Sequence, residues 1–230
     1  MRRLVTVDGP AGSGKTTLGR RLAIALRLPL IDTGLFYRGL TVAAVRAGVT
    51  ADDTDGLVRL AGLTTLHVST DPGTHADGGV VLVDGVDVSD GLRDPRNAAL
   101  LSTLSSIAGV RAALLEPQRE LAGEGAVAVG RDCGTVVFPD AAVKIYLQAS
   151  EEVRSRRRGR QLGASRGAAD ESRLGAEVSL RDRIDTTRQL APLRPADDAH
   201  IIDTGSHGID EVVTQAIALC AAAGLLPPDA

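Results

Sequence analysis

The sequence predicts an α/β protein in which a parallel sheet is covered by helices and carries a small antiparallel insertion and a helical lid. Short apolar runs at residues 4–7 and 28–31 predict buried strands. Each run precedes a stretch with apolar residues at helical spacing, residues 16–26 and 36–47. Strands that alternate with helices in this way are typical of a parallel sheet with helices on its faces.

The stretch from residue 63 to residue 88 interrupts this alternation. It contains three strand-like runs, at residues 66–68, 80–83 and 86–88. Asp84-Gly85, which separates the second and third runs, is a strong signal for a tight hairpin turn. We therefore expect a small antiparallel insertion, followed by helical structure over about residues 96–122.

The rest of the chain returns to the parallel-sheet pattern. Strands are expected at residues 126–129, 143–147 and 201–203, and a last helix at residues 210–223. We expect one unit of 230 residues, whose core comprises about residues 1–35, 123–152 and 190–230. The insertion then covers about 36–122, and an arginine-rich lid about 153–189.

Composition excludes several classes of protein. With 43% hydrophobic residues and a net charge of −3, the chain can bury a core and has no overall basic field for nucleic acid or an anionic membrane. No apolar run is long enough to span a membrane. Two cysteines are too few for a disulfide-stapled secreted domain. We expect a cytoplasmic monomer that binds neither nucleic acid nor membranes.

A phosphate-binding loop follows the first strand. The segment from Gly9 to Thr16 fits G-x-x-x-x-G-K-[ST] and opens a predicted helix, so the fold is a P-loop parallel sheet. Backbone N–H groups of such a loop surround phosphate oxygens, Lys15 reaches the β and γ oxygens, and the Thr16 hydroxyl can ligate Mg²⁺. The predicted ATP-binding residues are Gly9, Pro10, Ala11, Gly12, Ser13, Gly14, Lys15, Thr16 and Thr17.

A phosphate loop alone does not identify the reaction. Neither of the two lysines, Lys15 and Lys144, lies in an Asn-Lys-x-Asp guanine motif, which argues against a GTPase. A kinase for a small anion needs a second set of cations to hold the acceptor against the γ-phosphate. The candidates are Arg38, Arg111, Arg131, Arg181 and Arg188.

Three segments carry a resemblance to a known family. Residues 32–38, 130–140 and 181–193 resemble, in order, those of bacterial cytidylate kinases. The resemblance spans the chain and implies transfer of the γ-phosphoryl group of ATP to CMP or dCMP, with Mg²⁺. It also implies that the antiparallel insertion is an enlarged nucleoside-monophosphate domain and that the arginine-rich stretch is the lid.

The resemblance further implies roles for single residues. Arg38, Arg131 and Arg188 hold the acceptor phosphate, Arg181 and Asp185 hold its sugar, and Thr33 lines the same site. Ser102, Arg111 and Asp132 match positions that read cytosine, and a carboxylate suits the exocyclic amine of that base. Arg156 and Arg157 are the better matches among the lid arginines, with Arg154, Arg158 and Arg160 expected in solvent. The predicted catalytic residues are Lys15, Arg131, Arg157 and Arg188.

Other interpretations remain open at this point. Arg181, Asp185 and Arg188 lie on one face of a helix, a spacing that also fits an exposed salt-bridge stripe. Arg131 and Asp132 can equally form a surface turn. For the whole chain, the alternatives are a kinase for a modified cytidylate in a specialised pathway, a small-metabolite kinase of the shikimate or gluconate type, and a nucleotide-binding regulator without turnover.

Overall fold

The structure is a computed structural model that describes residues 3–74, 78–161, 179–180 and 182–227. Its elements confirm the predicted fold class, a parallel sheet with helices and a small antiparallel sheet. In chain order they are β1 (Arg3–Asp8), α1 (Lys15–Leu26), β2 (Leu30–Asp32), α2 (Thr33–Ala47), α3 (Thr54–Leu63), β3 (Leu66–Val68), β4 (Val81–Val83), β5 (Val86–Asp87), η2 (Ser89–Gly91), η3 (Pro95–Asn97), α4 (Ala98–Ser106), α5 (Ala108–Glu120), β6 (Gly125–Gly130), η4 (Cys133–Val137), β7 (Val143–Gln148), α6 (Glu151–Gln161), β8 (His200–Asp203) and α8 (Ile209–Ala222).

The main sheet has the strand order β2-β6-β1-β7-β8, and all its pairs are parallel. Strand β1 is central, and Asp8 at its end is in register with Gly130 of β6 and Tyr146 of β7. The carboxyl ends of parallel strands meet at one edge, where ligands bind in sheets of this kind. The loops after β1, β2 and β6 therefore share that edge.

The insertion forms a separate three-stranded antiparallel sheet in the order β3-β4-β5. Its tight turn is Asp84-Gly85, with φ of 49° and 81°. Two consecutive residues with positive φ form the turn that matches the twist of a hairpin. The hairpin predicted at this dipeptide is therefore confirmed.

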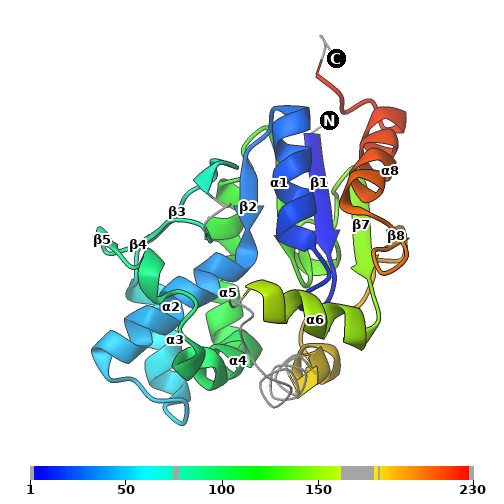
Figure 1. Cartoon of the computed structure of the whole chain (residues 1–230). Helices are drawn as coiled ribbons and strands as arrows, with labels where there is room; N and C mark the ends of the chain where they lie inside the picture. The colour runs from blue at the N-terminus through cyan, green and yellow to red at the C-terminus, as the bar shows by residue number, and fades with distance from the viewer. Residues whose placement is uncertain (1–2, 75–77, 162–178, 181, 228–230) are drawn as a thin grey trace.

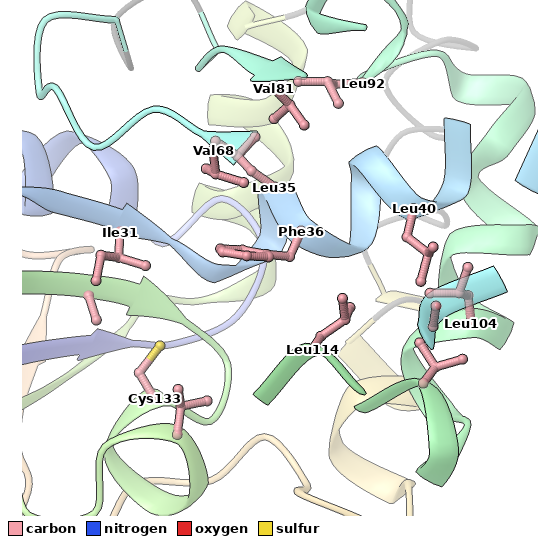
Figure 2. Packing of buried hydrophobic residues seen from close by; sticks show 14 of the residues in the cluster. Ile31, Leu35, Phe36, Leu40, Val68, Val81, Leu92, Leu104, Leu114 and Cys133 are labelled. Carbon is pink, nitrogen blue, oxygen red and sulfur yellow. The ribbon is translucent and has the colours of Figure 1, made fainter. Parts of the chain in front are cut away.

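Two apolar clusters stabilise the two parts of the fold. One lies around the main sheet with α1 and α8, and the other joins β2 and α2 to the insertion. In Figure 1 the helices α2–α5 and the strands β3–β5 lie to one side of the main sheet, and α6 crosses below the carboxyl end of β1. Figure 2 shows the second cluster, in which Phe36 and Leu40 of α2 lie with Val68, Val81 and Cys133.

Some elements differ from the expectation. Helix α2 begins at Thr33 instead of residue 36, because Asp32 caps it by accepting from the Gly34 N–H at 3.0 Å. Helix α3 was not predicted, although Asp53 is its N-cap and accepts from the Gly56 N–H. The helical stretch expected over 96–122 is two helices that meet at Ile107 with a bend of 88°.

Among the described residues no single helix is both long and apolar enough to cross a membrane. The bent pair Pro95–Ser106 and Ala108–Glu120 passes the same test of length and composition when its two helices are taken together.

Candidate active site

The loop between β1 and α1 has the backbone that a phosphate cradle needs. Gly9, Gly12 and Gly14 have φ of 148°, 74° and 95°, values that side-chain-bearing residues rarely adopt. A Cβ on Gly12 would lie 2.7 Å from the Arg154 carbonyl oxygen of α6, so glycine also lets that helix approach the loop. The sequence Gly-x-x-Gly-x-Gly thus sets both the shape of the loop and the position of α6.

The polar side chains of the loop are suited to bind an anion and a cation. The Ser13 hydroxyl is buried and has no hydrogen-bond partner among the described residues. The Lys15 ammonium donates to the Pro10 carbonyl at 2.7 Å, and the Thr16 hydroxyl lies 3.5 Å from an oxygen of Asp32. A hydroxyl beside a carboxylate offers the hard oxygen donors that Mg²⁺ prefers. No cluster of three or more His, Cys, Asp or Glu side chains suited to a metal occurs in the described part of the chain.

An ion pair between two residues of the predicted lid lies on this loop. Asp182 accepts from the Ala11 N–H at 3.0 Å and pairs with Arg154. Arg154 also donates to the Ala11 carbonyl at 3.1 Å. The expectation that Arg154 is solvated was wrong, since the residue is 8% exposed. Arg154 is shielded from solvent because it lies in the first turn of α6, which packs against Gly12 of the loop.

The other lid arginines differ among themselves. Arg157 donates to the Thr204 hydroxyl at 2.8 Å and to its carbonyl at 2.6 Å, and that hydroxyl donates to the Ser13 carbonyl at 3.1 Å. Arg157 is thus connected to the phosphate loop through one residue. Arg156 is exposed and pairs with Glu152 one turn earlier. The side chains of Arg158 and Arg160 lie outside the described part of the structure.

Beside the phosphate loop, arginines and aspartates from three parts of the chain form an arginine–aspartate network. Arg131 donates to Asp185 at 2.8 Å and to the Gly9 carbonyl at 3.2 Å, so it joins this network to the loop. Arg188 lies 3.5 Å from oxygens of both Asp132 and Asp185. Arg111 pairs with Asp132 and lies over the ring of Tyr37 at 5.6 Å. The network consists of Arg111, Arg131, Asp132, Asp185 and Arg188.

The network is buried. Asp132 and Asp185 are each 5% exposed, and the Arg188 side chain is 6% exposed. This burial contradicts two of the alternatives that the sequence left open, an exposed salt-bridge stripe and a surface turn. Burial lowers the pKa of Arg188, and its Nη2 atom has no hydrogen-bond partner among the described residues. This atom lies 3.5 Å from Asp132 without a hydrogen bond, and a buried donor in that state favours an anionic ligand because an unmade hydrogen bond costs free energy.

Three further predicted residues donate to backbone carbonyls, and a fourth is not among the residues that the structure describes. Arg38 donates to the Leu92 carbonyl at 2.8 Å, and Ser102 to the Ala98 carbonyl at 3.0 Å, one turn earlier in α4. Thr33 is buried and donates to the Val129 carbonyl at 3.1 Å. Arg181 lies outside the described residues. The structure thus brings Arg111, Arg131, Asp132, Asp185 and Arg188 together, while Arg38, Ser102 and Thr33 donate to backbone carbonyls outside this set.

Comparison with known proteins places this chain in a family. The model of the family described as cytidylate kinase matches residues 5–222. The chain belongs to the cytidylate kinase family. It is 44% identical over 216 residues to the cytidylate kinase of Pelotomaculum thermopropionicum, covering 93% of this chain and 94% of that protein. It is 43% identical over 218 residues to the cytidylate kinase of Corynebacterium efficiens, covering 94% and 93%.

These matches confirm the family resemblance inferred from three segments of the sequence, and none of the names supports a small-metabolite kinase. Among solved structures, an uncharacterized protein from Eubacterium ventriosum aligns with a TM-score of 0.50 at 12% identity. That alignment covers 95% of this chain and 98% of the other, and it shows a shared fold alone.

Sequence reasoning about this cytidylate kinase family site missed several residues. Three of them bond directly to the phosphate loop: Arg154, Asp182 and Thr204. The fourth is Asp8, a buried carboxylate that is 5% exposed. A signal existed for Asp8, a charged residue that ends an otherwise apolar strand immediately before Gly9. Asp182 and Thr204 carried none, because their contacts are with residues far away in the sequence.

Proposed function

We propose that this chain transfers the γ-phosphoryl group of ATP to CMP or dCMP, giving ADP and CDP or dCDP. The observation that carries the proposal is Arg131, which contacts the phosphate loop at Gly9 and the buried network at Asp185. One residue thereby joins a triphosphate cradle to a second cationic site. Two anionic substrates held side by side are what a transfer between nucleotides needs.

The donor side is the phosphate loop. Its backbone N–H groups and Lys15 hold the phosphates of ATP, and the buried Ser13 hydroxyl is available as a further donor. Thr16, with Asp32 beside its hydroxyl, would hold Mg²⁺. The ion would supply positive charge against the charge that develops during phosphoryl transfer. Pro10, Ala11 and Thr17 line the same loop.

The acceptor side is the arginine–aspartate network with its neighbours. In this proposal Arg38, Arg131 and Arg188 hold the phosphate of CMP, Arg181 and Asp185 hold the sugar, and Thr33 lines the site. Asp132 accepts from the exocyclic amine of cytosine, with Arg111 and Ser102 on the same base. The buried Nη2 of Arg188, which has no hydrogen-bond partner among the described residues, supports the phosphate role.

Catalysis in this arrangement comes from alignment and charge. The attacking oxygen of CMP is already anionic, so no strong general base is needed. Arg131 and Arg188 neutralise the acceptor phosphate, which would otherwise repel ATP. Their present partners, Asp132 and Asp185, keep these guanidinium groups paired inside the protein until the phosphate takes up part of the charge. Lys15 and the lid residue Arg157 stabilise the moving phosphoryl group.

The proposal includes the organisation of the chain. The core comprises about residues 1–35, 123–152 and 190–230, the CMP-binding insertion about 36–122 and the lid about 153–189. The lid excludes the water that would otherwise hydrolyse ATP. We propose a monomer that acts in the cytoplasm on small nucleotides.

A coupled assay of ADP release tests the function. The purified chain with ATP and Mg²⁺ is offered CMP, dCMP, UMP, AMP, dTMP and shikimate in turn. We expect turnover with CMP and dCMP that disappears when EDTA removes Mg²⁺. Tight CMP binding without ADP release overturns the proposal in favour of a regulator, and shikimate turnover overturns it in favour of a small-metabolite kinase.

A further inference from the structure

Asp8 is a buried carboxylate that none of the roles above uses. It ends the central strand β1, next to Gly9 of the phosphate loop, and is 5% exposed. Its two oxygens accept from two consecutive backbone N–H groups, Cys133 at 2.9 Å and Gly134 at 2.7 Å. Both bonds go to the loop after β6, so Asp8 connects the ends of neighbouring strands.

The accepting geometry fits the start of a helical turn. Cys133 and Gly134 open η4, and the N–H groups of a first turn have no partner within the turn. The carboxylate of Asp8 satisfies two of them. The turn also fits closely against β1, since a Cβ on Gly134 would lie 2.9 Å from the Thr6 hydroxyl. The Cys133 side chain is fully buried in the apolar cluster of Figure 2.

This turn holds Arg131 and Asp132, two residues that are proposed above to bind CMP. Arg131 and Asp132 immediately precede Cys133, and any tilt of η4 moves both. Arg131 also donates back to the Gly9 carbonyl at 3.2 Å. Two sets of hydrogen bonds therefore connect the ends of β1 and β6. Asp8 accepts from the backbone of the β6 loop, and the Arg131 side chain donates to Gly9, the residue after Asp8.

We propose that Asp8 is a positioning residue for the acceptor nucleotide, holding Arg131 and Asp132 against the phosphate loop through the N–H groups of Cys133 and Gly134. The inference rests on the proposed function and deepens it. Asp8 itself touches no substrate in this assignment. Its effect is expected on the binding of CMP and not on the binding of ATP, because both of its bonds go to the β6 loop.

The ionised form is the one that can hold the turn. Two donors face two acceptor oxygens, and a proton on either oxygen would place a donor opposite an N–H. Burial raises the pKa of Asp8 to about 6, against the two backbone hydrogen bonds, which lower it. Asp132 and Cys133 face it from the β6 loop, and Tyr146 and Lys144 lie on β7 beside it. The turn is therefore held at neutral pH and released on acidification.

The test compares Asp8→Asn with Thr6→Val, a matched control on the same strand whose buried hydroxyl has no hydrogen-bond partner among the described residues. Asparagine keeps the shape but offers one acceptor for two donors. We expect KM for CMP to rise about tenfold or more in Asp8→Asn, the loss of a hydrogen bond to a charged group, with KM for ATP within about twofold. Thr6→Val should leave both KM values near those of the parent protein.

A pH series separates positioning from a general structural defect. The effect of Asp8→Asn on KM for CMP should shrink from about pH 7.5 to about pH 5.5, since the parent protein then also loses the charged form. The phosphate of CMP titrates equally in both proteins and cancels in the ratio. Equal rises in both KM values, or a ratio independent of pH, overturn the positioning role. Absence of CMP turnover by the parent protein overturns the proposed function instead.

Discussion

The phosphate loop and the arginine–aspartate network are both proposed to bind phosphate groups, but they are built differently. The loop is a contiguous segment whose backbone is set by Gly9, Gly12 and Gly14, and its donors are mostly main-chain N–H groups. The network consists of side chains from α5, the β6 loop and the region around residue 185, and it is buried with its charges paired internally. Backbone geometry therefore preorganises the proposed donor side, and ion pairs between side chains preorganise the proposed acceptor side.

The largest effect is expected on the donor side. Lys15 is the one side-chain cation of the loop, so Lys15→Met should lower kcat about 10³-fold by removing charge that the transition state needs. Steady-state kinetics with CMP measure it. Arg21→Met is the control, since Arg21 is a partly exposed cation that pairs with Asp210, and this variant should keep near-normal kcat. A loss below about tenfold in Lys15→Met would contradict the donor role.

On the proposed acceptor side, Arg188→Met removes the cation that lies between Asp132 and Asp185 in the buried network. We expect kcat/KM for CMP to fall about 10²-fold, because Asp132 and Asp185 lose a shared partner and the phosphate loses a ligand. KM for ATP should change little. Arg183→Met, an exposed position on the same helical stretch, is the matched control. An equal rise in KM for CMP and for ATP would contradict the assignment of Arg188 to the acceptor side alone.

Asp132→Asn is expected to change which base the acceptor site prefers. Asparagine keeps the shape but can donate to the uracil carbonyl where the carboxylate can only accept. The preference for CMP over UMP should fall about tenfold or more, in line with one base-reading contact. Asp140→Asn, an exposed aspartate after the same turn, should leave the preference unchanged. An unaltered ratio in Asp132→Asn would assign cytosine reading to other residues.

The two regions also differ in how far the sequence predicts them. The loop residues are adjacent in the chain, and their strand and helix follow from local apolar patterns, as does the hairpin at Asp84-Gly85. The network depends on contacts between Arg111, Asp132 and Arg188, which lie far apart in the chain. Only the family resemblance brought these residues together before the structure did, and residue patterns alone allowed an exposed stripe.

Features that the sequence did not predict depend mainly on contacts between remote parts of the chain. Arg154 has the same local setting as its neighbours Arg156 and Arg157, and only the approach of α6 to Gly12 makes it buried. Asp182 is one of several charged residues in its segment, and its partner Ala11 is remote. Helix α3 was missed although Asp53 caps it, because its apolar residues, Leu57 and Ala61 among them, were not assigned to an element.

The smallest effect is expected where the lid region meets the loop. Asp182 places a carboxylate on the Ala11 N–H, inside a loop that binds anions, and its charge opposes ATP. Asp182→Asn keeps an acceptor for that N–H, so KM for ATP should fall about threefold, a modest change typical of one charge in a partly solvated site. Asp198→Asn, an exposed aspartate paired with Lys144, controls for charge alone. A higher KM for ATP would mean instead that Asp182 serves the donor side by holding Arg154 over the loop.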